Sequence, residues 1–268
     1  MRIIDAHLHF APESYFDKLA AEAGHENSSA HLAAAYEKYN IAAGVVMGNF
    51  PLERVDYLYP ENLYYCAGID GVIYDRADMA EQLDALEKHL QRSDCVGIKF
   101  YPGYRFFYVG DDRLAPVYEL AAKYDKPVAV HTGLTASDNA LLKYSHPLTL
   151  DEAAVKFPKV RLVMCHFGEP WFDDAAAVVF KNPNVSVDLS GMLEGKIADM
   201  AEFLRQKSGL VNRLKDMLAY LNMYDRFMFG TDWPLANLGD YIEFVKAFVP
   251  EKYWESVFHA NAERVYGI

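Results

Sequence analysis

Short runs of β-branched and aliphatic residues recur along the chain, and stretches with the spacing of amphipathic helices separate most of them. Eight such runs are predicted to be strands, at residues 2–7, 43–47, 64–69, 96–100, 127–131, 160–166, 184–188 and 226–231. Several are apolar at nearly every position, which is typical of parallel strands covered on both faces. Because crossovers between parallel strands are right-handed, this alternation of strands and helices is compatible with two main architectures, a closed barrel or an open doubly wound sheet. The count of eight favours the α/β fold known as the (β/α)8 TIM barrel.

The intervening stretches supply the predicted helices. In residues 79–91, Met79, Leu83, Leu86 and Leu90 share one face, as expected for a helix packed on a sheet. Other helices are predicted at residues 30–39, 114–124, 150–157, 173–180, 197–220, 238–248 and 253–266. No linker or repeat is found, and 268 residues is close to the roughly 250 typical of one barrel. We therefore expect residues 1–268 to form a single domain.

Charge and cysteine content restrict the expected partners and compartment. The chain carries 38 acidic and 26 basic side chains, a formal net charge of −12, and no basic stripe that would follow a phosphate backbone. Nucleic acid is therefore not an expected partner, and residues 1–10 resemble neither a signal peptide nor a membrane span. The cysteines Cys66, Cys95 and Cys165 lack the spacing of a zinc or redox motif. We expect a cytoplasmic protein with buried thiols. A homodimer is expected only because barrel enzymes often self-associate.

Histidines and an aspartate stand where predicted strands end. His7 and His9 close the first strand, and because side chains alternate along a strand, both imidazoles point to the same face. His131 and His166 close the fifth and sixth strands, and Asp232 follows the eighth. In a closed barrel the carboxyl ends of all strands form one mouth, so these five side chains are predicted to meet there. The other histidines lie in predicted helices or loops and receive no role.

This set of residue types predicts a metal site. Imidazole and carboxylate ligands suit zinc, manganese, iron or cobalt, and no thiolates indicate a closed structural zinc site. We therefore expect a divalent cation with an open coordination position, Zn²⁺ in the first place and Mn²⁺ as the alternative. Such an ion activates water and polarises a carbonyl oxygen, while Asp232 would hold the water and carry its proton.

The ordered motifs DAHLHF, GIKFYPGY, VHTG, CHFGEPW, GTDWP and NAERVYGI extend over the whole chain. As a set, the sequence resembles the amidohydrolase-related metal-dependent hydrolases of the amidohydrolase 2 type, which include aminocarboxymuconate semialdehyde decarboxylase. The resemblance implies that His7 and His9 are the ligand pair of the first strand, His131 the ligand of the fifth, and Asp232 the last ligand and the base. His166 matches a histidine that binds a second metal in some relatives and contacts substrate or water in others.

Lys99 ends the fourth predicted strand, where related binuclear enzymes carry a carboxylated lysine between two metals. An unmodified Lys99 would instead hold a substrate carboxylate, so both readings stay open. Large side chains follow the strand ends, and Tyr101, Arg105, Trp171 and Trp233 are predicted to contact substrate. An aromatic wall with two cations indicates a small planar or cyclic molecule that bears a carboxylate.

Three further carboxylates are predicted to orient the ligands from outside the site. Asp5 has the same strand parity as His7, and Glu169 and Asp188 lie near predicted strand ends.

The leading hypothesis for function is a metal-dependent hydrolase, with Asp232, His166 and Lys99 as catalytic residues and metal-activated water attacking an amide, ester or lactone carbonyl. The alternative is a lyase, a non-oxidative decarboxylase of the aminocarboxymuconate semialdehyde or resorcylate decarboxylase kind, which uses the same ligands. A metal-free lactonase and a non-catalytic barrel are further alternatives. The number of bound ions and the natural substrate stay open.

Overall fold

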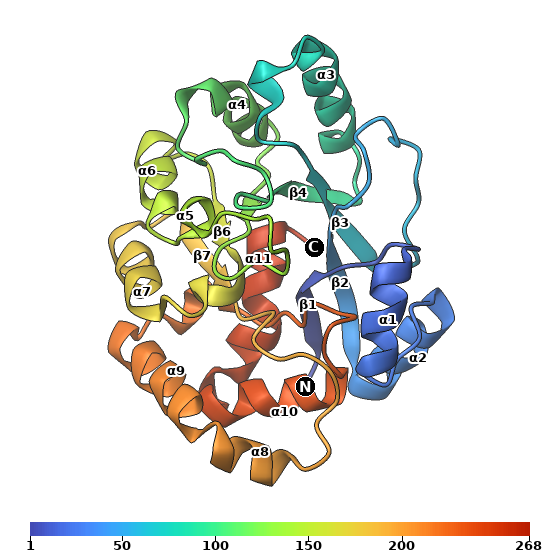
Figure 1. Ribbon diagram of the computed structural model, residues 1–268, viewed down its shortest axis with the longest axis vertical. Coiled ribbons are helices and arrows are strands. Elements are labelled where there is room, and N and C mark those ends of the chain that lie inside the picture. Colours follow the sequence, from blue (N-terminus) through green and yellow to red (C-terminus); the bar gives the residue numbers. More distant parts are fainter.

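A computed structural model describes residues 1–268 and contains one sheet of eight parallel strands in consecutive order, β1 to β8 (Figure 1). The strands are β1 (Ile3–Leu8), β2 (Ile41–Met47), β3 (Leu63–Gly68), β4 (Cys95–Phe100), β5 (Val128–Val130), β6 (Leu162–Met164), β7 (Val185–Asp188) and β8 (Phe227–Met228). Every run predicted to be a strand overlaps one of them. The predicted TIM-barrel fold is confirmed.

The barrel closes between its first and last strands through a few backbone bonds rather than a regular ladder. The Ala6 amide donates to the Phe229 carbonyl at 2.9 Å, and the Asp232 amide donates to the His7 carbonyl at 2.8 Å. Leu8 and Trp233 form an isolated parallel bridge. This seam brings the ends of β1 and β8 together, and with them three of the predicted metal ligands.

Helices surround the strands and cover the outer face of the barrel (Figure 1). They are α1 (Ser14–Glu22), α2 (Ser29–Tyr39), α3 (Met79–Leu90), α4 (Ala115–Lys123), α5 (Leu142–Ser145), α6 (Thr149–Lys156), α7 (Phe172–Lys181), α8 (Met200–Gln206), α9 (Ser208–Leu221), α10 (Leu238–Phe248) and α11 (Asn261–Tyr266). Short 3-10 turns lie at η1 (Ile73–Asp75), η2 (Asp112–Leu114), η3 (Cys165–Gly168), η4 (Tyr224–Arg226) and η5 (Glu251–Tyr253), and a π turn lies at η6 (Ser256–Ala260). No helix combines the length and the hydropathy that crossing a membrane requires.

Several sequence predictions of elements need correction. The single helix expected at 197–220 is two helices, because the backbone leaves the helical conformation at Lys207, between α8 and α9. Asp199 caps the start of α8 by accepting from the Glu202 amide. The helix expected at 253–266 contains the π turn η6. The sixth strand stops early because His166 and Phe167 have positive φ angles of 61° and 47°. Helices α1 and α5 were not predicted at all.

The buried side chains form two groups, as expected for a barrel with a helical coat. A group of 60 residues fills the layer between strands and helices. A second group of 14 contains alternate strand residues such as Ile4, Val45 and Val163, together with Val265 and Tyr266 of α11. This second group is the barrel interior, which α11 covers at one end (Figure 1). All three cysteines are buried free thiols, which confirms that prediction.

Candidate metal centre

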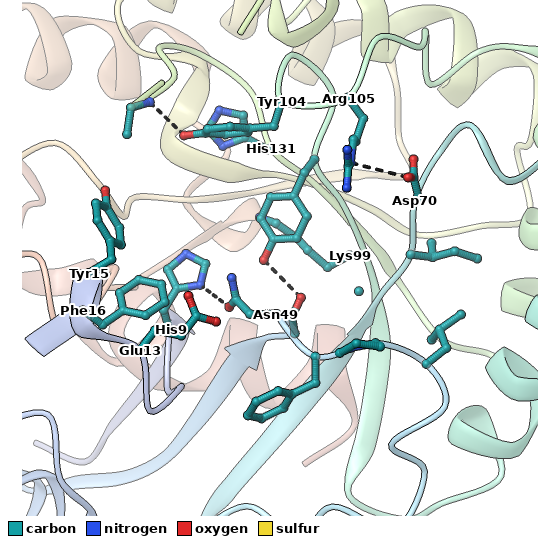
Figure 2. Close-up of a pocket in the computed structure, with 18 of the residues that line it drawn as sticks. His9, Glu13, Tyr15, Phe16, Asn49, Asp70, Lys99, Tyr104, Arg105 and His131 are labelled. Atoms are coloured by element: carbon teal, nitrogen blue, oxygen red, sulfur yellow. Dashed lines mark hydrogen bonds and ion pairs between the residues drawn. The ribbon is translucent and has the colours of Figure 1, made fainter. Parts of the chain in front are cut away.

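A cavity of about 780 Å³ opens at the carboxyl ends of the strands. It is lined by all six chemistry-bearing residues that the sequence analysis placed at strand ends, namely His7, His9, Lys99, His131, His166 and Asp232. Figure 2 shows His9 on one side of this cavity, Lys99 near its middle, and Arg105 with Asp70 on the opposite side. The closed barrel therefore brings together side chains that are more than 200 residues apart in the sequence.

Three of these residues converge closely at the seam between β1 and β8. Asp232 Oδ1 lies 3.2 Å from His9 Nε2 and 3.4 Å from His7 Nε2. The three ligand atoms all lie within 4.8 Å of one another. His7 Nε2 and Asp232 Oδ1 are buried and have no hydrogen-bond partner in the protein.

The outer hydrogen bonds of the two imidazoles determine which atoms face this centre. His7 Nδ1 lies 2.9 Å from Asp188 Oδ2, and His9 Nδ1 lies 2.8 Å from Asn49 Oδ1. Both oxygens only accept hydrogen bonds, so both Nδ1 atoms carry the proton and both Nε2 atoms present lone pairs. Two lone pairs thus face a carboxylate oxygen, an arrangement that is costly when buried unless a cation lies between them. The residues fit a divalent cation with nitrogen and oxygen ligands.

The electrostatics agree with this assignment. Burial lowers the pKa of His7 to about 4, although the Asp188 carboxylate opposes that shift, so His7 is neutral at pH 7. Burial alone would raise the pKa of Asp232, but the neighbouring imidazoles, with His7 first, outweigh it and hold that pKa well below its ordinary range. A neutral imidazole and an ionised carboxylate are the forms that bind a metal.

His131 and His166 line the same cavity but lie outside the group of three. Their rings are 5.0 Å apart, and His166 is 4.7 Å from the His7 ring. His131 Nε2 donates to the Leu134 carbonyl at 3.0 Å, which leaves Nδ1 as its free lone pair. Burial holds the pKa of His131 well below its ordinary value, so the ring is neutral. The roles of His131 and His166 as ligands stay predictions.

Two outer carboxylates support the ligands, as predicted. Asp188 holds His7 as described, and Asp5 accepts from the Thr231 amide at 2.9 Å and the Thr231 hydroxyl at 2.6 Å. Burial raises the pKa of Asp5 to about 7, while the two bonds from Thr231 oppose the shift. Asp5 thereby links β1 to the segment that carries Asp232. The prediction for Glu169 is wrong, because its side chain makes no hydrogen bond to His166 or another ligand.

Lys99 is fully buried at the inner wall of the cavity. Its Nζ donates to Cys165 Sγ at 2.9 Å and lies 5.1 Å from the centre of the Tyr101 ring. The sequence analysis missed this thiol contact because Cys165 has no motif partner and was interpreted only as a small buried side chain. Carboxylation of Lys99 stays a prediction.

The predicted substrate contacts divide into two groups. Tyr101 and Arg105 line the cavity, and Arg105 Nε lies 3.4 Å from Asp70 Oδ2 (Figure 2). Trp171 and Trp233 do not reach it, which corrects that prediction. Trp233 is fully buried against Phe10, and Trp171 packs on His146.

Part of the cavity wall was not predicted. The start of α1 contributes Glu13, Tyr15 and Phe16, and the loop after β2 contributes Asn49, whereas Tyr104 is one of the large side chains expected at the mouth after the fourth strand (Figure 2). Their position directly after strand ends was the available signal, because the loops that follow strand ends form the mouth of a TIM barrel.

Sequence comparison assigns the family. The model of the family described as Amidohydrolase matches residues 4–268, which is nearly the whole chain. The chain belongs to the amidohydrolase family. It is therefore an enzyme of the amidohydrolase superfamily, whose members use a divalent metal. Among curated proteins, this amidohydrolase is 32% identical to Protein fluG from Emericella nidulans over 84 residues, a match that spans 31% of the chain and only 10% of that protein.

Solved structures share the fold of this amidohydrolase over almost its full length. An amidohydrolase from Burkholderia multivorans with bound zinc has a TM-score of 0.68 at 18% identity, with 100% of both chains covered. The 2,6-dihydroxybenzoate decarboxylase from Rhizobium has a TM-score of 0.67 at 14% identity, covering 100% of this chain and 99% of that one. A probable 2-pyrone-4,6-dicarboxylic acid hydrolase from Acinetobacter baumannii has a TM-score of 0.64 at 15% identity, with both chains fully covered. These likenesses establish the fold and include both reaction classes.

Proposed function

We propose that this amidohydrolase is a metal-dependent hydrolase, in which water attacks the carbonyl carbon of an amide, ester or lactone. The observation that supports hydrolysis is the set of lone pairs at the floor of the cavity. His7 and His9 present unprotonated Nε2 atoms there, and Asp232 presents a carboxylate. With His7, His9 and Asp232 Oδ1 holding the cation, Asp232 Oδ2 remains as a proton acceptor, which suits the activation of water better than the delivery of a proton to carbon.

The proposed cation is zinc, with manganese as the alternative, held by His7, His9 and Asp232 and with His131 and His166 as further candidates. When bound, such a cation lowers the pKa of water toward neutrality and polarises a carbonyl oxygen. Asp232 Oδ2, the oxygen turned away from His7 and His9, would accept the proton that the attacking water loses.

The proposed substrate is a small molecule that bears a carboxylate. Lys99 and Arg105 are the cations that support this, and Asp70 orients the guanidinium of Arg105 through a single contact at Nε. The ion pair with Asp70 uses only Nε of Arg105, which leaves the two Nη groups free to bind a carboxylate in bidentate fashion. The relative named for a dicarboxylic acid hydrolase agrees with this substrate class.

A non-oxidative decarboxylase is the second candidate. It is favoured by the same cations, which would hold a substrate carboxylate near the metal, and by the fold shared with a 2,6-dihydroxybenzoate decarboxylase. This reaction would require a proton donor to the carbon that loses carbon dioxide, a role opposite to the one proposed for Asp232.

The deciding experiment incubates zinc-loaded protein with a panel of aromatic and cyclic carboxylates that includes lactones, esters, amides and hydroxybenzoates, in water enriched in oxygen-18. We expect oxygen-18 in a newly formed carboxylate, and loss of turnover in Asp232→Asn. Release of carbon dioxide without oxygen-18 in the product would overturn the hydrolase proposal in favour of the lyase.

A further inference from the structure

The end of β7 connects the imidazoles of His7 and His166 through one buried carboxylate. Asp188 Oδ2 accepts from His7 Nδ1 at 2.9 Å, and Asp188 Oδ1 accepts from the Ser190 hydroxyl at 2.5 Å. The Ser190 hydroxyl oxygen lies 2.9 Å from His166 Nδ1. Asp188 also accepts from the backbone amide of His166 at 3.0 Å. Asp188 and Ser190 are both fully buried.

The direction of these hydrogen bonds follows from which of the groups carry a proton that they can donate. The Asp188 carboxylate can only accept, so the single Ser190 hydroxyl proton is donated to it. The Ser190 oxygen then has only lone pairs to offer His166, and His166 Nδ1 must carry the ring proton. In a neutral imidazole this leaves Nε2 without a proton.

His166 Nε2 is the atom of this relay that the cavity can reach. His166 lines the cavity, and its Nε2 has no hydrogen-bond partner in the protein and is not among the enclosed unpaired atoms. Ser190 does not line the cavity, so it acts on the reaction only through His166.

The backbone beside Ser190 leaves His166 little freedom to turn. Gly191 has a φ angle of +71°, and a Cβ placed there would lie 2.5 Å from His166 Nδ1 and 3.0 Å from Asp232 Oδ2. Only glycine fits a position with both a positive φ and this close approach. His166 itself adopts a φ of 61°, in the left-handed region, so the β6 strand does not continue through it. The ring is thus enclosed on the side of its protonated nitrogen.

We propose that Ser190 is a positioning residue that fixes the Nδ1-protonated tautomer of His166, and that His166 Nε2 is therefore a hydrogen-bond acceptor for the attacking water or substrate. This differs from a role as oxyanion donor, which would need a proton on Nε2. The role of His166 Nε2 as an acceptor for water or substrate rests on the proposed hydrolase function, whereas the assignment of the His166 tautomer does not. One carboxylate, Asp188, then sets the proton position on both His7 and His166.

The test combines spectroscopy with kinetics on the full chain. Protein labelled with nitrogen-15 in histidine is studied without metal by long-range nitrogen–hydrogen NMR, with His166→Gln used to assign the signals. We expect wild-type His166 to carry its proton on Nδ1 and Ser190→Ala to show a mixture of both tautomers. In the zinc-loaded form, Ser190→Ala should lower kcat about ten-fold or more and change KM by less than about two-fold.

Ser145→Ala is the matched control, because Ser145 is also a buried serine and its hydroxyl donates to the Gly133 carbonyl away from His166. It should leave the His166 signals and kcat unchanged. A proton on Nε2 of wild-type His166, or an unaltered tautomer in Ser190→Ala, would overturn the inference. The expected tautomer together with no hydrolysis of any substrate would instead count against the proposed function alone.

Discussion

The two histidines at the centre of this site are each held by a partner on the outer side. His7 is held by Asp188 and His9 by Asn49, through bonds that fix the nitrogen left for a cation. The inner atoms, in contrast, find no partner in the protein, as His7 Nε2 and Asp232 Oδ1 show. This combination of fixed outer bonds and unsatisfied inner atoms is the residue-level mark of a metal site.

Replacing one ligand should therefore abolish metal retention. We expect elemental analysis of wild-type protein after dialysis to find about one divalent ion per chain, and His7→Ala and Asp232→Ala to retain less than about a tenth of that. His146, a half-buried histidine that does not line the cavity, is the control when replaced by alanine and should retain the wild-type amount. Two ions per wild-type chain would favour the carboxylated form of Lys99, and no ion even after reconstitution would contradict the site.

For single residues, the sequence could predict which side chains lie at the ends of strands but not which groups surround them. His131 and Asp232 were found because the end of a strand in a barrel fixes where its last side chain lies. Trp233 was misplaced because the residue after Asp232 turns into the protein, a property of the loop path that no periodicity records. The contact between His9 and Asn49 joins two loops 40 residues apart, which leaves no local signal.

Among the elements, the seam between β1 and β8 is the place where the barrel depends on side chains. β8 has only two residues in its ladder, and Asp5 adds bonds to the amide and hydroxyl of Thr231 across the seam. The sequence predicted strand 226–231 from its apolar run. It could not predict that the regular strand would be limited to Phe227–Met228, because register with a neighbouring strand depends on the closed barrel.

Removing the hydroxyl of Thr231 should weaken this seam. Thr231→Val keeps the side-chain volume but leaves a buried carboxylate short of one hydrogen bond, so we expect the free energy of unfolding to fall by about 1–3 kcal/mol. Urea denaturation followed by circular dichroism measures the change. Thr149→Val, which removes a partly exposed hydroxyl from the start of α6, is the control and should cost less than about 1 kcal/mol. Equal losses in the two variants would contradict a special role of the seam.

A second element-level prediction concerns the start of α10. His25 Nε2 accepts from the Leu238 amide at 3.1 Å, and His25 Nδ1 lies 2.9 Å from His31 Nε2. Burial, with His31 adding to it, lowers the pKa of His25 from 6.5 to about 4. In the unfolded chain His25 therefore binds a proton near pH 6.5, whereas in the folded protein it binds one only near pH 4. Stability from His25 is present above pH 6.5 and is lost as the pH falls toward 4.

Urea denaturation at several pH values measures this loss. His25→Gln should flatten the decline in unfolding free energy between about pH 6.5 and 4 by on the order of 1 kcal/mol, a figure reduced for partial solvent screening. A pH dependence identical in wild type and variant would show that the His25 proton does not differ between the folded and unfolded states.

The helices illustrate which elements the spacing of apolar residues can and cannot predict. α3 was predicted within one residue because Leu83, Leu86 and Leu90 repeat at helical spacing. α1 was missed because only Phe16 and Ala20 of its nine residues are buried, too few to produce a periodic signal. The break between α8 and α9 follows from the turn at Lys207, not from a change in composition.

For the whole molecule, a cation at the seam would join the first strand to the last. Binding to the folded protein alone should then raise its stability, by about 2.7 kcal/mol at a free zinc concentration 100 times the Kd. We expect excess zinc to raise the Tm of wild-type protein, chelation to lower it and abolish turnover, and Asp232→Asn to remove the response. Full activity after thorough chelation would favour the metal-free lactonase.

The position of the ligands in the chain also has a consequence for synthesis. His7 and His9 leave the ribosome long before Asp232, and β1 stays without its β8 neighbour until almost all of the barrel has been made. The complete set of predicted ligands therefore exists only after the last strand has emerged, so a cation held by these residues would be loaded into a finished barrel rather than a growing one. Metal supply would then limit the maturation of this enzyme and not the folding of its early strands.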